Sequence, residues 1–104
     1  MTVKELIEII DSDEFTGDSI YTDDEFSINS IYYRNGEVIL QSNEIDSECE
    51  LDVSFISHCL NYFDYDDEIC FMICDEDNDF WFYDITSHYI DGEGDIRLNL
   101  SSRD

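Results

Sequence analysis

Apolar residues recur with two different periods along the chain, and these periods predict both helices and strands. Val3, Leu6 and Ile10 recur at spacings of three and four, which is typical of a helix with one face on a core. Residues 51–60 repeat this stripe. The sequence therefore predicts two short helices, over residues 2–10 and 51–60.

The other apolar segments are short and bounded by polar turns, a pattern that predicts strands. Asn35-Gly36 separates two of these segments and favours a tight β-hairpin. The segment 69–74 is apolar at every position, which is typical of a central strand that is covered on both faces. The predicted strands are residues 19–22, 26–33, 37–42, 69–74, 80–90 and 95–100.

Both halves of the chain have the same predicted order of one helix and three strands. We expect an α+β fold that is a tandem αβββ duplication, with an antiparallel sheet or sheets packed against two helices. The alternative, that any two αβββ stretches align loosely, stays open. The aligned pairs are Val3 with Val53, Leu6 with Ile56, Ile10 with Leu60, Ile28 with Ile85, Ser30 with Ser87, Tyr32 with Tyr89, Val38 with Ile96 and Leu40 with Leu98.

The predicted repeats span about residues 1–48 and 49–104 of a single domain, 1–104. A half of this size buries too little apolar surface to be stable alone, so we expect the two repeats to share one core. Whether they form one continuous sheet or two is not predicted.

The charge of the chain excludes several classes of function. There are 28 acidic and 4 basic residues among 104, a net charge of −24, of which residues 1–51 and residues 52–104 each carry −12. The 42% hydrophobic content is too high for a disordered acidic tail. Four basic residues cannot neutralise a phosphate backbone, so we expect no direct binding to nucleic acid or to an anionic membrane. With no apolar run near the roughly 20 residues of a membrane span, we expect a soluble, unsecreted, cytoplasmic protein.

Many of the acidic residues gather in three predicted turns, with two aromatic residues in or beside them. The third turn begins like a calcium-binding loop, but Phe80 and Thr86 stand where an EF-hand needs Gly and Glu. We expect solvated turns that bind a protein partner, with weak, nonspecific binding of divalent cations but no specific metal site and no cofactor. The candidate partner-binding residues are Asp23, Asp24, Glu25, Asp64, Tyr65, Asp66, Asp67, Glu68, Asp75, Glu76, Asp77, Asp79 and Trp81.

The cysteines do not predict a metal site or an enzyme. No pair has the CxxC spacing of a zinc site, and we expect all four to be small, reduced core residues. An acidic surface disfavours the thiolate that nucleophilic catalysis would need. We expect no catalytic residues. The residues considered are Cys49, Cys59, Cys70, Cys74, His58 and His88.

The magnitude of the charge suggests what it is for. B-DNA carries one negative charge per roughly 1.7 Å of its axis, so the charge of this chain corresponds to about 40 Å of duplex. A compact chain of this length has a radius of gyration of about 13 Å. The protein thus presents DNA-like charge over a DNA-like length, which favours docking into a cationic groove.

The opening MTVKELIEII, the short strands around an Asn-Gly hairpin and the dense Asp and Glu resemble small acidic proteins encoded by phages and mobile elements. Several of these are DNA-mimic inhibitors of the anti-CRISPR or antirestriction class. The resemblance covers size, charge and element order, and matches no diagnostic motif. It implies a basic nucleic-acid-binding partner in the cytoplasm of a bacterial host cell, such as a CRISPR effector, restriction enzyme, nuclease or other DNA-binding protein.

We therefore expect a stoichiometric inhibitor whose acidic turns imitate phosphates, with Tyr65 or Trp81 in place of bases. An immunity protein that caps a basic nuclease toxin is one alternative. A salt-adapted or cation-binding acidic protein is another, and an enzyme is the least favoured.

Overall fold

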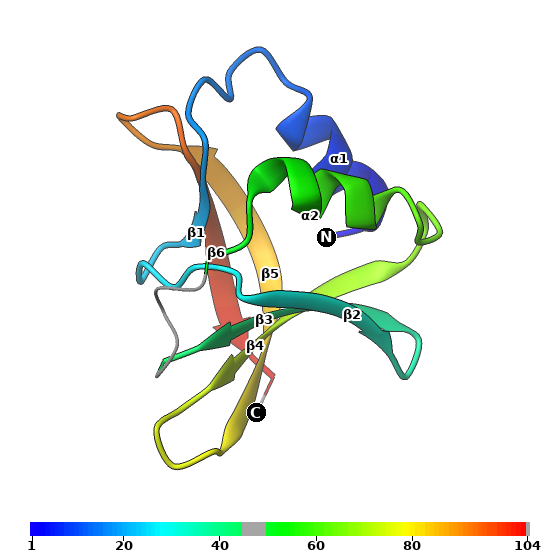
Figure 1. The fold of residues 1–104 in the computed structure, drawn as a ribbon, viewed down its shortest axis with the longest axis vertical. Helices are drawn as coiled ribbons and strands as arrows, with labels where there is room; N and C mark the ends of the chain where they lie inside the picture. Colours follow the sequence, from blue (N-terminus) through cyan, green and yellow to red (C-terminus); the bar gives the residue numbers. More distant parts are fainter. Residues whose placement is uncertain (45–49, 104) are drawn as a thin grey trace.

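The computed structural model describes residues 1–44 and 50–103, which form two helices and one six-stranded sheet strongly curled into a half-barrel (Figure 1). The α+β class is as expected, and the halves form one continuous sheet. The elements are α1 (Val3–Ile10), β1 (Ile20–Thr22), β2 (Ser30–Arg34), β3 (Glu37–Asn43), α2 (Val53–Leu60), β4 (Glu68–Cys74), β5 (Phe80–Ile90) and β6 (Ile96–Ser102).

The sheet is mixed, so the prediction of an antiparallel sheet was wrong. Its strand order is β1-β6-β5-β4-β3-β2, and the pairs β3·β4 and β1·β6 are parallel. The three remaining pairs are antiparallel. The helix α2 connects β3 to β4 as a crossover, which returns the chain to the same end of the sheet and makes those two strands parallel.

Local sequence accounts for where the elements begin and end. The Thr2 hydroxyl accepts a hydrogen bond from the Glu5 amide (3.2 Å) and caps α1. Asn35 and Gly36 both have positive φ, 52° and 84°, as the predicted tight hairpin between β2 and β3 requires. The predicted strand 26–33 was too long at its start, because the Phe26 amide turns back to the Thr22 hydroxyl (3.0 Å).

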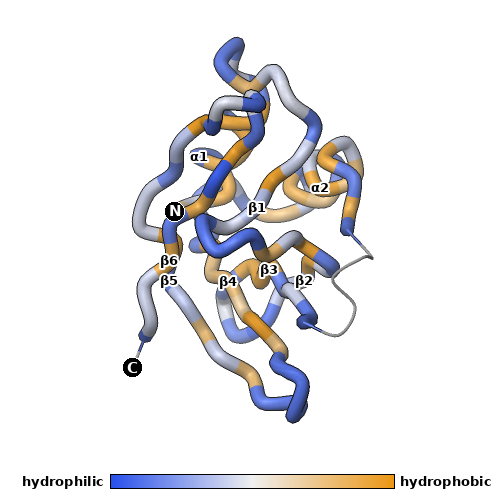
Figure 2. The backbone as a smooth tube through the Cα atoms, turned by 90° about the vertical axis from the view of Figure 1, so that its left-hand side faces the viewer, coloured by the Kyte–Doolittle hydropathy of each residue, from blue (hydrophilic) through white to orange (hydrophobic). Residues whose placement is uncertain are grey.

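Both helices pack against one end of the inner, concave face of the sheet (Figure 1). Figure 2 shows apolar strands beneath the helices and hydrophilic turns at the two ends of the molecule. The buried cluster takes residues from both halves of the chain. It comprises Val3, Leu6, Ile20, Ile28, Val38, Leu40, Ile56, Leu60, Ile69, Phe71, Ile73, Ile85, Ile96 and Leu98.

A smaller buried cluster lies on the outer face, where Ile39, Cys70 and Met72 pack with Tyr32. Burial raises the pKa of the Cys70 thiol to about 11, as expected for an inert core cysteine. Cys59 and Cys74 are half-buried free thiols. The prediction for Cys49 lies outside the described residues.

Strand pairing repeats between the two halves of the sheet. Tyr32 lies opposite Ile39 in the β2·β3 pair, and Tyr89 lies opposite Arg97 in the β5·β6 pair. The parallel pairs β3·β4 and β6·β1 also correspond to one another. Of the described helices, neither is long enough to cross a membrane.

Candidate functional site

The three acidic turns lie at different places along the sheet. The turn between β4 and β5 lies at the end of the sheet remote from the helices (Figure 1). The turn after β1 lies beside the middle of β6, where Thr22 is paired with Leu98. The turn before β4, residues 64–68, lies at the opposite end of β4. Seven residues of extended chain separate it from the β4–β5 turn by about 20 Å. The structure brings residues of the other two predicted clusters together.

The turn at residues 64–68 holds the start of the chain. Its main-chain oxygens at Tyr65 and Asp67 accept hydrogen bonds from the amides of Lys4 (3.1 Å) and Val3 (2.9 Å). The Glu68 carboxylate pairs with the terminal ammonium of Met1 at 3.4 Å. This turn thus provides hydrogen-bond acceptors for amides at the start of α1, which have no partner within the helix. The side chains of Asp64, Tyr65 and Asp66 remain exposed.

Asp75 organises the β4–β5 turn. One of its carboxylate oxygens accepts hydrogen bonds from the amides of Asp77 and Asp79, both at 2.9 Å. The other oxygen accepts from the indole N–H of Trp81, also at 2.9 Å. The Trp81 bond, followed by the main-chain bonds, lowers the pKa of Asp75. Asp75 therefore fixes the loop and the orientation of Trp81 as a charged group.

The β5–β6 turn has the same design, built on Asp91. Its carboxylate accepts from the amides of Glu93 (2.9 Å) and Asp95 (3.0 Å), and from Nε of Arg97 (2.8 Å). The Arg97 bond is the first cause of the lowered pKa of Asp91. Arg97 also stacks over the ring of Tyr21, with 4.8 Å between its guanidinium carbon and the ring centroid.

A sequence signal for these two turns was present and was missed. Both read Asp, two residues, Asn or Gly, then Asp, over residues 75–79 and 91–95. The fourth residue has positive φ in each case, 63° at Asn78 and 83° at Gly94. In each turn, the residue six positions after the first Asp donates to that Asp.

The turn after β1 follows a related plan, with Thr22 in place of the first Asp. Glu25 occupies the fourth position with a φ of 71°, a conformation that is unusual for a non-glycine residue. The Asp23 carboxylate accepts a hydrogen bond from the Tyr89 hydroxyl, which raises the pKa of Tyr89. Asp24 is exposed.

A groove of about 280 Å³ lies between the turn after β1 and the β4–β5 turn. Asp24 and Asp75 reach it from the predicted clusters, and Trp81 from the predicted aromatic pair. Glu44, at the end of β3, adds a third carboxylate that sequence reasoning did not single out. We call this cavity the acidic groove. Its lining residues are Asp24, Phe26, Glu44, Ile73, Asp75, Trp81, Tyr83 and Leu100.

Two of the four basic residues are neutralised within the chain. Arg97 pairs with Asp91, as above, and Arg103 donates to Glu37 (2.9 Å) and Asp84 (2.8 Å). The Arg103 bond lowers the pKa of Glu37. Lys4 and Arg34 have no carboxylate partner among the described residues.

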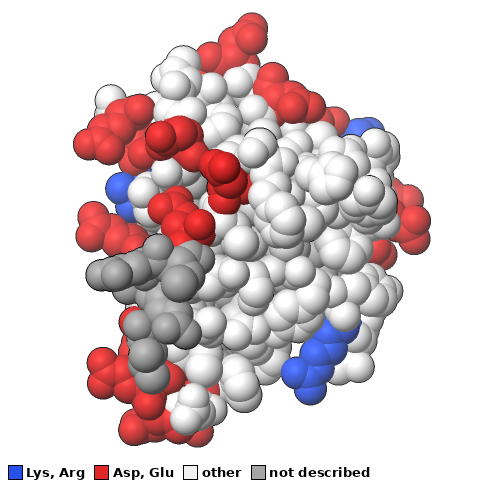
Figure 3. Space-filling model, viewed as in Figure 1, with Lys and Arg blue, Asp and Glu red and all other residues white. Residues whose placement is uncertain are grey.

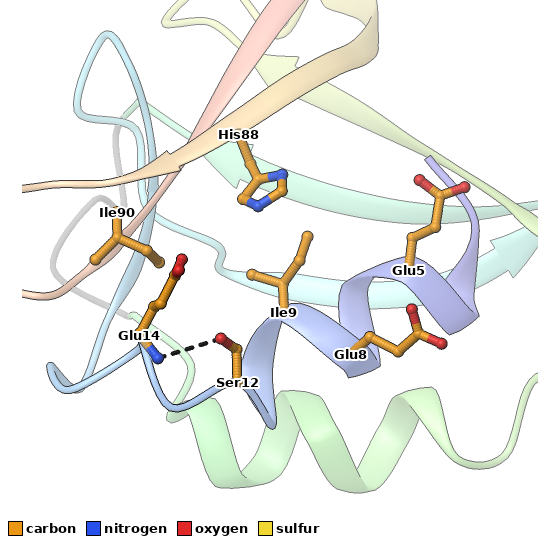
Figure 4. A pocket seen from close by; sticks show the side chains of 7 residues that line it. All are labelled: Glu5, Glu8, Ile9, Ser12, Glu14, His88 and Ile90. Atoms are coloured by element: carbon orange, nitrogen blue, oxygen red, sulfur yellow. Dashed lines mark hydrogen bonds between the residues drawn. The ribbon is translucent and has the colours of Figure 1, made fainter.

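A second cavity, of about 310 Å³, lies between α1 and β5 (Figure 4). His88 points into it from β5 toward Ile9 of α1. Glu5, Glu8 and Glu14 surround it, and the Glu14 amide donates to the hydroxyl of Ser12 at 3.2 Å. This cavity contains none of the predicted partner-binding residues, so its glutamates provide a matched control for the acidic groove.

One cluster has carboxylate oxygens close enough to share a cation. Oxygens of Asp75, Asp77 and Asp79 lie within 4.8 Å of one another. Both oxygens of Asp75 already accept hydrogen bonds from the protein. The hydrogen bonds of the β4–β5 turn therefore account for this cluster.

The charge is unevenly distributed over the surface. In Figure 3 acidic side chains gather mainly along the edges of the face shown, while its centre is largely uncharged. The molecule measures 39 × 29 × 23 Å, with a radius of gyration of 12.7 Å. Its long dimension is close to the roughly 40 Å of duplex that would carry the same charge.

The fold and site thus define a small, strongly acidic α+β protein with a half-barrel sheet and an acidic groove at its open end. No family model, curated protein or solved structure matches the chain.

Proposed function

We propose that this protein is an acidic DNA mimic that binds the cationic nucleic-acid groove of a host defence effector and blocks its access to DNA. The class would be anti-CRISPR or antirestriction, and the partner a CRISPR effector, restriction enzyme or other basic nuclease. The protein acts by occupancy and needs no catalytic residue, metal or cofactor.

The observation that carries the proposal is the density of uncompensated charge. A net charge of −24 lies on a body 39 Å long, and two of its four basic residues are held in ion pairs inside the chain. Concentrated charge of one sign attracts a partner of opposite sign and accelerates association. Displacing counterions from the partner, as DNA does, would favour the complex.

The test is competition with DNA. A fluorescent duplex is bound in turn to candidate CRISPR effectors and restriction enzymes, and the protein is added at increasing salt. We expect displacement at low salt and a steep loss of affinity as salt rises, since exposed charges are screened beyond about 8 Å at physiological ionic strength. Failure to displace DNA from every candidate effector at low salt would overturn the proposal.

Matched charge variants test which turns matter. The variant set Asp24→Asn, Glu76→Gln and Asp77→Asn removes three exposed charges from the two neighbouring turns. The control set Glu5→Gln, Glu8→Gln and Glu14→Gln removes three charges beside α1. We expect the first set to reduce the slope of log affinity against log salt concentration by about one for each contact that is lost. The control set should reduce this slope less. Equal effects would contradict a leading role for the turns.

We also infer that the chain is a tandem αβββ duplication with one shared core. The support is the repeated strand pairing. The sequence alignment pairs Tyr32 with Tyr89, and in the sheet these residues lie opposite Ile39 and Arg97. Ile39 and Arg97 are 58 positions apart, which is the offset at which the alignment pairs Leu40 with Leu98. The boundary between the repeats, near residues 48 and 49, lies outside the described residues. Coincident unfolding transitions of the helices and of Trp81 would support the shared core, and separate transitions would contradict it.

A further inference from the structure

The acidic groove is the part of the inner sheet face that the helices leave uncovered. Alternation along the strands directs Ile73 of β4 and Trp81 of β5 to this face, where they lie opposite one another. The helices cover the other end of the same face (Figure 1). Phe26 closes one side from the turn after β1. Part of the cavity wall is therefore apolar and aromatic.

Three carboxylates surround these walls, each from a different segment. Asp24 comes from the turn after β1, Glu44 from the end of β3, and Asp75 from the β4–β5 turn. No described basic residue lines the groove. The Trp81 side chain is 47% exposed, and its indole N–H is held by Asp75, so one aromatic surface is fixed beside negative charge.

We propose that the acidic groove binds one arginine side chain of the protein's partner. The guanidinium would stack on Trp81 and donate hydrogen bonds to Asp24 and Glu44. This inference rests on the proposed function, because arginine is the residue with which DNA-binding proteins most often contact DNA bases and phosphates.

Size and chemistry favour arginine over other occupants. A cavity of about 280 Å³ lies just below the roughly 300–1,000 Å³ of small-molecule sites, which suits one side chain better than a helix or strand. A planar guanidinium can both stack on an aromatic ring and bind a carboxylate with two N–H groups, whereas the ammonium of lysine is a compact point charge.

The chain already combines an arginine with a carboxylate and an aromatic ring at another turn. In the equivalent β5–β6 turn, Arg97 donates to Asp91 and stacks on Tyr21. In the β4–β5 turn, the position equivalent to Arg97 is Trp81, which donates to Asp75. Asp75 is thus satisfied by an aromatic N–H and not by a cation. The partner would supply the cation, which would stack on Trp81 and bind Asp24 and Glu44.

The experiment uses the intact protein and a small probe. Because Trp81 is the single tryptophan, its emission reports on the groove directly. We expect saturable 1:1 binding of Nα-acetyl-arginine amide, with binding at least about tenfold weaker for the citrulline analogue, which has the same shape without the charge. The lysine analogue should bind more weakly than arginine.

Variants locate the binding. Asp24→Asn with Glu44→Gln leaves the Asp75 turn intact and should weaken arginine binding by about fivefold to tenfold, since partly exposed ion pairs contribute up to about 1 kcal/mol each. Glu5→Gln with Glu8→Gln removes the same charge beside α1 and should change the affinity by less than about twofold. The indole N–H resonance of Trp81 provides a second readout of the same binding.

The outcomes separate the groove from the proposed function. An absent response of Trp81, equal binding of citrulline, or equal loss in the two variants would overturn the arginine site. None of these results depends on an effector, so DNA displacement by the protein would still stand. If DNA displacement fails while arginine binds as expected, the groove is a cation site and the partner must be another basic protein.

Discussion

At the scale of single residues, one carboxylate organises each of the two similar hairpin turns. Asp75 and Asp91 each accept two main-chain amides and one side-chain N–H. Such bonds stabilise the ionised form, which is why both pKa values are lowered. A protein with so many acidic residues therefore uses some of them to build turns, and leaves others exposed for a partner.

The β5–β6 turn packs closely on the segment before β1, and Gly94 makes this contact possible. A Cβ at Gly94 would lie 2.2 Å from the Thr16 hydroxyl and 2.9 Å from the Gly17 nitrogen, and φ is 83°. We expect Gly94→Ala to lower the free energy of unfolding by about 2–4 kcal/mol, from combined backbone strain and overlap. Urea unfolding followed by Trp81 emission measures this.

Gly36→Ala is the matched control, because Gly36 has a similar φ of 84° and no atom lies within 4 Å of the position that its Cβ would take. It should cost only about 1 kcal/mol, from the backbone conformation alone. Equal losses at Gly36 and Gly94 would show that the close contact contributes nothing.

At the scale of elements, helices and strands were predictable because each has a local signal. The stripe at Val3 and Leu6 and the run 69–74 lie in the expected elements, and the Asn35-Gly36 turn formed as predicted. The parallel pairs were not predicted, because pairing depends on where a crossover returns the chain. A strand, helix, strand order over residues 37–74 was a usable signal for one of them.

The candidate site was predictable in part for the same reason. Asp24, Asp75 and Trp81 were identified because acidic turns and aromatic residues are visible in the sequence. Their meeting in one groove depends on the curl of the sheet, which has no local signal. Glu44 was missed because it is a lone acid at the end of a strand, and Asp64 to Glu68 lie elsewhere.

The Asp91 turn predicts a pH dependence of stability. Its pKa is lower in the folded protein than in the unfolded chain, so its contribution is present above the unfolded value of about 3.9 and is lost as pH falls through the folded value. The difference in free energy of unfolding between wild type and Asp91→Asn should therefore shrink as pH falls from about 5 to about 3.

Asp66→Asn is the control for this experiment. It removes the same charge from an exposed residue for which the described structure shows no side-chain hydrogen bond. Subtracting its effect removes the general change in repulsion. A difference for Asp91→Asn that stays constant across this pH range would contradict the assigned hydrogen bonds.

At the scale of the whole molecule, the net charge of −24 opposes folding through self-repulsion. Two arginines offset part of it locally. Arg103 joins the start of β3 to β5 through Glu37 and Asp84, and Arg97 joins β6 to the β5–β6 turn. The proposed function depends on the negative charge that these ion pairs leave uncompensated.

We expect added salt to stabilise the protein, with most of the gain at low concentration. Between about 0.01 M and 0.15 M the screening length falls from about 30 Å, which is comparable with the dimensions of the molecule, to about 8 Å, which is well below them. Melting curves in NaCl should show the midpoint rising by several degrees and then levelling. A midpoint that keeps rising to molar salt would favour the salt-adapted alternative.

The pairing of β1 with β6 also affects when the protein can become active during its synthesis. Among the described strands, β1 pairs only with β6. Ile20 therefore cannot pair until its partner Ile96 has been synthesised. Contacts so distant in sequence close late in folding. The acidic groove joins Asp24 to Leu100 of β6, so it forms only after β6 has been translated. A nascent chain should therefore carry its charge well before it has a finished binding site.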